Sequence, residues 1–199
     1  MTTATAGDQP ASGYPINYAV SYPTSLSRGL IFVKWLLAVP HLLILYALNA
    51  VFEVLTFIAF FAILFTARYP KGLFDFNVGI RRWYLNVFAY ICLQRDEYPP
   101  FSLDAGAYPV AFEVEYPASL NRWLIFIKWL LAIPHLVIIA VLSIIAFVVT
   151  IVAWFAILLT GKYPEGMFNF VVGVTRWTQR VTLYVLLMTD KYPPFSLEP

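Results

Sequence analysis

Charged side chains are scarce in this sequence. Asp, Glu, Lys and Arg make up 12% of the 199 residues, whereas ordinary soluble domains contain about 25%. Cys92 is the only cysteine, which excludes an internal disulfide and any metal site built from several cysteines. The formal net charge of +2 is too small to indicate a nucleic-acid partner. Hydrophobic residues reach 61%, and this balance indicates an integral membrane protein rather than an ordinary soluble domain.

Two apolar runs dominate the chain, from Leu30 to Thr66 and from Leu124 to Thr160. As one straight helix, either run would span about 55 Å, whereas the hydrocarbon core of a bilayer is about 30 Å thick. We therefore expect each run to fold back as a transmembrane helical hairpin. The turns are predicted near residues 49–53 and near Ser143.

The two runs belong to an internal repeat. Shifting the chain by 94 residues aligns residues 22–103 with 116–197 without a gap, and 45 of the 82 positions are identical. The sequence predicts a polar leader over residues 1–13, with no cleaved signal peptide, followed by membrane repeats over 14–107 and 108–199. Both repeats must share one fold.

The basic residues suggest how these repeats sit in a membrane. All 13 Lys and Arg fall outside the predicted hairpin turns, which by the positive-inside rule places both termini in the cytoplasm. Four spans in two parallel repeats, related by an axis along the membrane normal, account for this pattern. Three spans per repeat are the alternative, but they would invert the second copy.

Shorter elements flank the runs. Residues 13–23 and 109–117 alternate apolar and polar side chains, which predicts two short strands that pair, or two extended segments at the headgroup level. Residues 77–93 and 171–188 are predicted as amphipathic helices in the membrane interface, with a third span as the alternative. The fold class is thus an all-α membrane protein with short extended or β segments on its cytoplasmic side.

Two histidines are the main candidates for chemistry. His41 and His135 occupy equivalent positions, each seven residues after a lysine, Lys34 or Lys128, so each pair shares one helix face. Ionisable groups within a membrane indicate function by default. One hypothesis brings both imidazoles together as ligands of a haem or a metal ion. The alternative is that each histidine packs between helices and bonds a polar neighbour or a carbonyl freed by the adjacent proline, so no cofactor is predicted.

Arginines beside tryptophans form a second repeated set. Such pairs at the cytoplasmic interface are candidates for binding anionic lipid headgroups, or they simply anchor the protein at the headgroup level. The candidates are Arg82, Trp83, Arg176 and Trp177, together with Arg28 and Arg122 near the starts of the apolar runs.

Catalytic motifs are missing. The sequence has no phosphate loop, no nucleophile–base pair, and no pair of carboxylates that recurs in both repeats; Asp75 corresponds to Asn169. We expect a non-enzymatic protein. An accessory or scaffold subunit that packs in a larger membrane complex, or organises lipid, fits best, and a small transporter or a haem or metal redox carrier that uses His41 and His135 is the alternative.

Four repeated motifs carry a family resemblance. They are Tyr-Pro-x-Ser-Leu-x-Arg, Phe-x-Lys-Trp-Leu-Leu-Ala-x-Pro-His, Arg/Lys-Tyr-Pro-x-Gly-x-Phe-x-Phe, and Arg-Trp followed by Tyr-Pro-Pro-Phe-Ser-Leu. Together they resemble the bacterial membrane-protein family known as domain of unknown function 4389 (DUF4389), in two copies. Aromatic residues at 18% and the scarcity of polar groups in the apolar runs suit packing against acyl chains or protein, so lipid and other membrane subunits are the expected partners. The resemblance itself implies a bacterial plasma membrane protein. It implies no activity.

Overall fold

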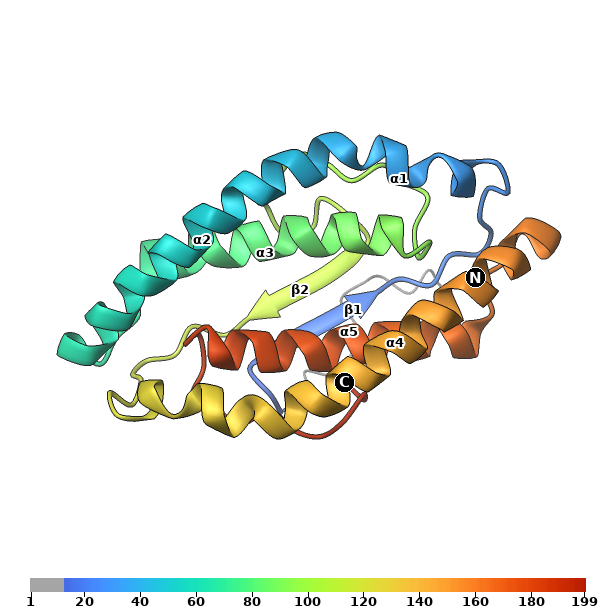
Figure 1. Ribbon diagram of the computed structural model, residues 1–199. Coiled ribbons are helices and arrows are strands. Elements are labelled where there is room, and N and C mark those ends of the chain that lie inside the picture. The colour runs from blue at the N-terminus through green and yellow to red at the C-terminus, as the bar shows by residue number, and fades with distance from the viewer. Residues whose placement is uncertain (1–12) are drawn as a thin grey trace.

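The computed structural model describes residues 13–199, so the expected leader lies almost wholly outside the described residues. Each repeat contributes a strand, a short 3-10 helix, a long apolar helix and an amphipathic helix (Figure 1). In chain order the elements are β1 (Ile16–Val20), η1 (Leu30–Phe32), α1 (Lys34–Leu37), α2 (Val39–Thr66), α3 (Lys71–Ile91), β2 (Val110–Val114), η2 (Leu124–Phe126), α4 (Lys128–Thr160) and α5 (Glu165–Val185).

The predicted strands form and pair with each other. β1 and β2 make a two-stranded antiparallel sheet in which Tyr18 lies opposite Phe112. These two residues are also equivalent in the repeat, so a pseudo-twofold axis passes between them, perpendicular to the sheet. Alternate residues of β1 are buried, whereas Glu113 of β2 faces outward and is exposed. The sheet therefore has one buried and one polar face.

The predicted hairpins are wrong. Each apolar run forms one continuous helix through the expected turn: α2 runs through residues 49–53 and α4 runs through Ser143. Neither run contains glycine or proline after its histidine, so nothing in the local sequence ends the helix. Asn49 even donates to Glu53 one turn later, which supports the helix at the expected turn. The thickness of the bilayer limits the length of a helix only if that helix crosses the membrane along the membrane normal.

Both helices are candidates for membrane spans. By length and composition, α2 and α4 are apolar enough to cross a bilayer, and within the described residues no other helix meets the same test. Only 17% of the most apolar window of each helix is buried, which differs from the core helix of a soluble protein. The repeat thus contains one such helix rather than two.

The amphipathic helices lie inside the protein. α3 and α5 begin six residues before the predicted helices, because the Tyr-Pro-x-Gly segment starts the next helix at Lys71 and Glu165. α2 packs on α3 and α4 packs on α5, while α3 and α5 pack on β2 and β1, respectively. Each inner helix therefore contacts the strand of the other repeat.

The two repeats interlock at further points. The Leu26 amide donates to the Gly161 carbonyl, and the Leu120 amide donates to the Ala67 carbonyl in the equivalent bond. One hydrophobic core joins both strands, both inner helices and the last turns of α2 and α4. The repeats are therefore one folding unit. In Figure 1 the second repeat, in the lower half, has the arrangement of the first repeat rotated by half a turn. α2 and α4 therefore run in opposite directions along opposite edges of the molecule.

Candidate functional site

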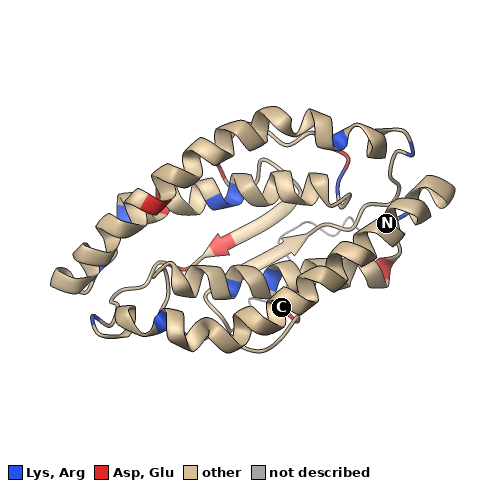
Figure 2. Ribbon diagram, in the orientation of Figure 1, with Lys and Arg blue, Asp and Glu red and all other residues tan. Residues whose placement is uncertain are grey.

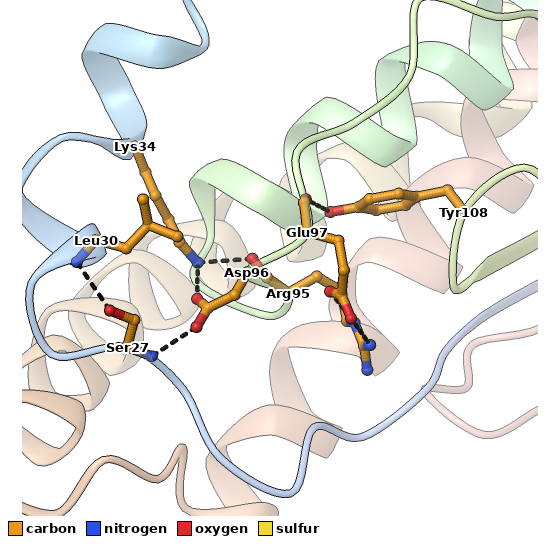
Figure 3. A network of polar contacts seen from close by, with 7 residues as sticks. All are labelled: Ser27, Leu30, Lys34, Arg95, Asp96, Glu97 and Tyr108. Atoms are coloured by element: carbon orange, nitrogen blue, oxygen red, sulfur yellow. Dashed lines mark hydrogen bonds and ion pairs between the residues drawn. The ribbon is translucent and has the colours of Figure 1, made fainter.

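A buried lysine opens each long helical segment. The Lys34 side chain is 2% exposed, and its Nζ lies 2.7 Å from Oδ1 of Asp96 and donates to the Arg95 carbonyl at 2.6 Å (Figure 3). The other carboxylate oxygen of Asp96 accepts from the Ser27 amide, and the Ser27 hydroxyl accepts from the Leu30 amide. The carboxylate thus joins the start of the helix to the segment after α3.

The second repeat builds the same network. Nζ of Lys128 lies 2.7 Å from Oδ1 of Asp190 and donates to the Thr189 carbonyl at 2.9 Å. Asn121 takes the place of Ser27, and its side-chain oxygen accepts from the amides of Trp123 and Leu124. The Asn121 side chain thus binds backbone amides at the start of the second helical segment, as the Ser27 hydroxyl does in the first.

Each histidine lies in an aromatic cluster within its own repeat. Nε1 of Trp83 donates to Nδ1 of His41 at 3.0 Å, and the imidazole stacks on Phe101 with ring centroids 3.9 Å apart. Trp177 and Phe195 hold His135 in the same way, at 3.1 Å and 3.8 Å. Both histidines are 0% exposed. This arrangement matches the packing alternative.

The structure does not bring the two imidazoles together. The helices that carry them lie along opposite edges of the molecule (Figure 1), and the clusters around Trp83 and Trp177 are separate. Within residues 13–199, no group of three or more His, Cys, Asp or Glu side chains is placed to hold a metal ion. A haem bound by both His41 and His135 does not fit this geometry.

The position of the proton on each imidazole argues against a metal ion bound by His41 or His135 alone. Nδ1 of each neutral imidazole accepts from an indole N–H, so its proton must be on Nε2. A metal ligated through Nε2 would move this proton to Nδ1 and set two N–H donors against each other. The bonds from Trp83 and Trp177 therefore hold the imidazoles in the form that does not ligate through Nε2.

Arg82 and Arg176 bind backbone carbonyls. Arg82 donates to the carbonyls of Leu103, at 2.8 Å, and Phe112, at 3.3 Å. Arg176 donates to the carbonyls of Leu197, at 2.7 Å, and Tyr18, at 2.8 Å. Each arginine thus ties the end of its own repeat to the strand of the other repeat. Burial lowers the pKa of both guanidinium groups.

The remaining sequence candidates divide between surface and interior. Arg28 and Arg122 are exposed and remain available to headgroups. Trp83 and Trp177 are buried and belong to the histidine clusters. The exposed indoles are instead those of Trp35, Trp123 and Trp129. Figure 2 shows that, beyond the lysines at their starts, the long helices carry almost no charge.

Both repeats match one protein-family model. The family model described as domain of unknown function (DUF4389) matches residues 28–102 and 122–196. The chain belongs to the DUF4389 family. Each DUF4389 copy runs from the arginine before the 3-10 helix to the serine of the Tyr-Pro-Pro-Phe-Ser-Leu segment, so it includes the lysine, the histidine and all their partners described above. No curated protein and no solved structure shows a significant match to the chain.

Asp96 and Asp190 form ion pairs with the buried lysines, and the sequence analysis did not predict these pairs. Asp96 and Asp190 occupy equivalent positions in the two DUF4389 copies, as do the two lysines. The presence of both residue types in both copies is the sequence signal that could have predicted the ion pairs. Lysine and aspartate are more than 60 residues apart in each copy, and no local periodicity connects them. Both lysines are therefore bound within the protein, by Asp96 and Asp190, and do not reach lipid headgroups.

Proposed function

We propose that this DUF4389 protein is a non-enzymatic scaffold inserted in the bacterial plasma membrane, where α2 and α4 contact acyl chains and neighbouring membrane proteins. The exposed apolar surface of these two helices carries the proposal. Monomeric soluble proteins rarely expose contiguous apolar patches larger than a few hundred Å². Here large apolar side chains are exposed along the whole length of both helices, among them Leu43, Val54, Phe65, Ile144 and Leu159.

The use of the polar groups supports a structural role. Lys34, Lys128, Arg82 and Arg176 are all bound to carboxylates or carbonyls of the same chain, and both histidines accept from tryptophan. These side chains hold the repeats in shape. A transporter or redox carrier would need some of them free for its cargo or cofactor, so the scaffold role is the better account.

The symmetry favours insertion into one leaflet. Because the pseudo-twofold axis makes α2 and α4 antiparallel, two crossing helices would require this axis to lie in the membrane midplane. The strand pair on the axis would then lie in the midplane as well. Unpaired backbone groups at sheet edges cost several kcal/mol each in hydrocarbon. The exposed carboxylates of Glu53 and Glu113 would add about 3 kcal/mol or more for a charge at the bilayer centre.

An axis along the membrane normal avoids these costs. α2 and α4 then lie lengthwise in one leaflet, and the polar face of the sheet meets water. Both copies present their basic residues to the same side, which by the positive-inside rule is the cytoplasm. The exposed indoles of Trp35 and Trp129 suit the interface. We therefore place the described ends of the chain on the cytoplasmic side.

Photolabelling tests the proposal. The protein is reconstituted in liposomes that contain a phospholipid with a diazirine at the end of an acyl chain, irradiated, and mapped by mass spectrometry. We expect labelled peptides from residues 39–66 and 128–160, and none from the outer face of the sheet around Glu113. Labelling that misses both long helices would refute contact with acyl chains.

A further inference from the structure

A cavity lies between α3, α4 and α5. It has a volume of about 470 Å³ and is lined mostly by apolar and hydroxyl side chains, including Phe88, Phe147, Val171 and Val174. Small-molecule sites commonly measure about 300–1,000 Å³. Phe147 of α4 is 67% exposed, so the cavity reaches the apolar surface assigned above to acyl chains.

Among the residues that the structure describes, Arg81 is the only charged one that lines this cavity. Its Nε donates to Oε1 of Gln179 at 2.7 Å, and its guanidinium carbon lies 4.8 Å from the centre of the Tyr84 ring. Both partners are neutral, and within residues 13–199 no carboxylate forms a salt bridge with Arg81. Desolvation lowers the pKa of Arg81. A partly buried cation without a counter-ion is costly, and an anion beside it would offset that cost.

The repeat shows that the shared fold does not require this arginine. The residue equivalent to Arg81 is Thr175, and the residue equivalent to Gln179 is Leu85. The Thr175 hydroxyl donates to the Val171 carbonyl of its own helix. By contrast, the neighbouring Arg82 has a true equivalent in Arg176, and both hold carbonyls. The bond between Arg81 and Gln179 thus has no equivalent between Thr175 and Leu85.

We propose that the cavity binds an anionic phospholipid of the surrounding bilayer. One acyl chain fills the apolar space between α3, α4 and α5, and the phosphate pairs with the outer nitrogens of Arg81, for which no protein acceptor is found within residues 13–199. Gln179 holds the guanidinium in place through Nε. This inference rests on the proposed membrane insertion and names the lipid class that the scaffold selects.

Native mass spectrometry of the full chain in detergent micelles tests this site. With added phosphatidylglycerol, the wild type should retain one lipid, and it should bind phosphatidylcholine at least tenfold more weakly. Arg81→Gln should lose this preference. Arg68→Gln is the matched control, because it removes an exposed arginine outside the cavity and should keep the preference.

A second variant separates binding from folding. Ala146→Trp fills the cavity and keeps Arg81, so it should reduce retention of both lipids at least tenfold while circular dichroism stays unchanged. Equal retention of phosphatidylglycerol by wild type, Arg81→Gln and Ala146→Trp would overturn the site, as would one-to-one binding of oleate with no retained phospholipid. Acyl-chain photolabelling of α2 and α4 would still succeed in either case, so failure of this site is distinct from failure of the scaffold proposal.

Discussion

The indole N–H of Trp83 points at Nδ1 of His41 across 3.0 Å in the interior of the first repeat. Trp83→Phe removes this donor and leaves a buried nitrogen without a partner, which costs about 1–3 kcal/mol. We expect the free energy of unfolding in detergent to fall by this amount, and Trp177→Phe to have the same effect. Urea unfolding followed by circular dichroism measures both.

The double variant serves as the control for this bond. In His41→Phe combined with Trp83→Phe, neither polar group remains, so part of the lost stability should return. A double variant whose loss equals the sum of the two single losses would show that the hydrogen bond does not couple these residues.

The buried lysine and its aspartate should also be coupled. Lys34→Met leaves Asp96 beside an apolar side chain, and removal of one partner of a buried ion pair costs about 3–5 kcal/mol. We expect the low end, because the Asp96 side chain is 26% exposed. Asp96→Asn should cost less, since the amide oxygen still accepts from Ser27. A double-mutant cycle by thermal unfolding gives the coupling energy, and additive losses would rule out the pair.

The two classes of arginine should respond differently. Arg82→Lys loses the fork that reaches two carbonyls, so we expect a loss of stability of about 1–3 kcal/mol with little change in binding to anionic vesicles. Arg28→Gln and Arg122→Gln should instead weaken vesicle binding, by about 1 kcal/mol per residue, with little effect on stability. Sedimentation with phosphatidylglycerol vesicles measures this difference. The reverse pattern would indicate that Arg82, rather than Arg28 or Arg122, binds lipid headgroups.

Close packing of the inner helices leaves no room for a side chain at one glycine of each repeat. A Cβ added at Gly79 would lie 2.9 Å from Cβ of Leu103, so Gly79→Ala should destabilise the protein by about 1–3 kcal/mol. Gly72 is the matched control on the same helix, since an added Cβ there meets nothing within 4 Å. Gly72→Ala should be neutral or stabilising by up to about 1 kcal/mol. Equal melting temperatures for the two variants would contradict the packing of α3 on Leu103.

Local patterns predicted the local elements well. The alternation of apolar and polar residues predicted β1 and β2, and both strands form and pair. The shift of 94 residues predicted one fold for both copies, and the structure repeats the lysine–aspartate, histidine–tryptophan and arginine–carbonyl contacts. Such features depend on residues close in the chain, or on comparison of the chain with itself.

Features that depend on distant residues were missed. The hairpin prediction compared the length of each apolar run with the thickness of the bilayer, and it assumed that a helix in the position of α2 crosses along the membrane normal. The role of Arg82 depends on the carbonyl of Phe112 in the other repeat, which no spacing reveals. The lysine network needs Asp96, and the histidine cluster needs Trp83, each supplied by a segment far along the chain.

The orientation of α2 in the membrane tests the account most directly. Arg28 and Arg68 flank this helix and are both exposed. Each is replaced singly by cysteine in a Cys92→Ala background, and a membrane-impermeant maleimide is added to sealed membrane vesicles of either orientation. If α2 lies in one leaflet, Arg28→Cys and Arg68→Cys will both react only from the cytoplasmic side. Reaction of the two cysteines from opposite sides would show that α2 crosses the bilayer and would contradict the account.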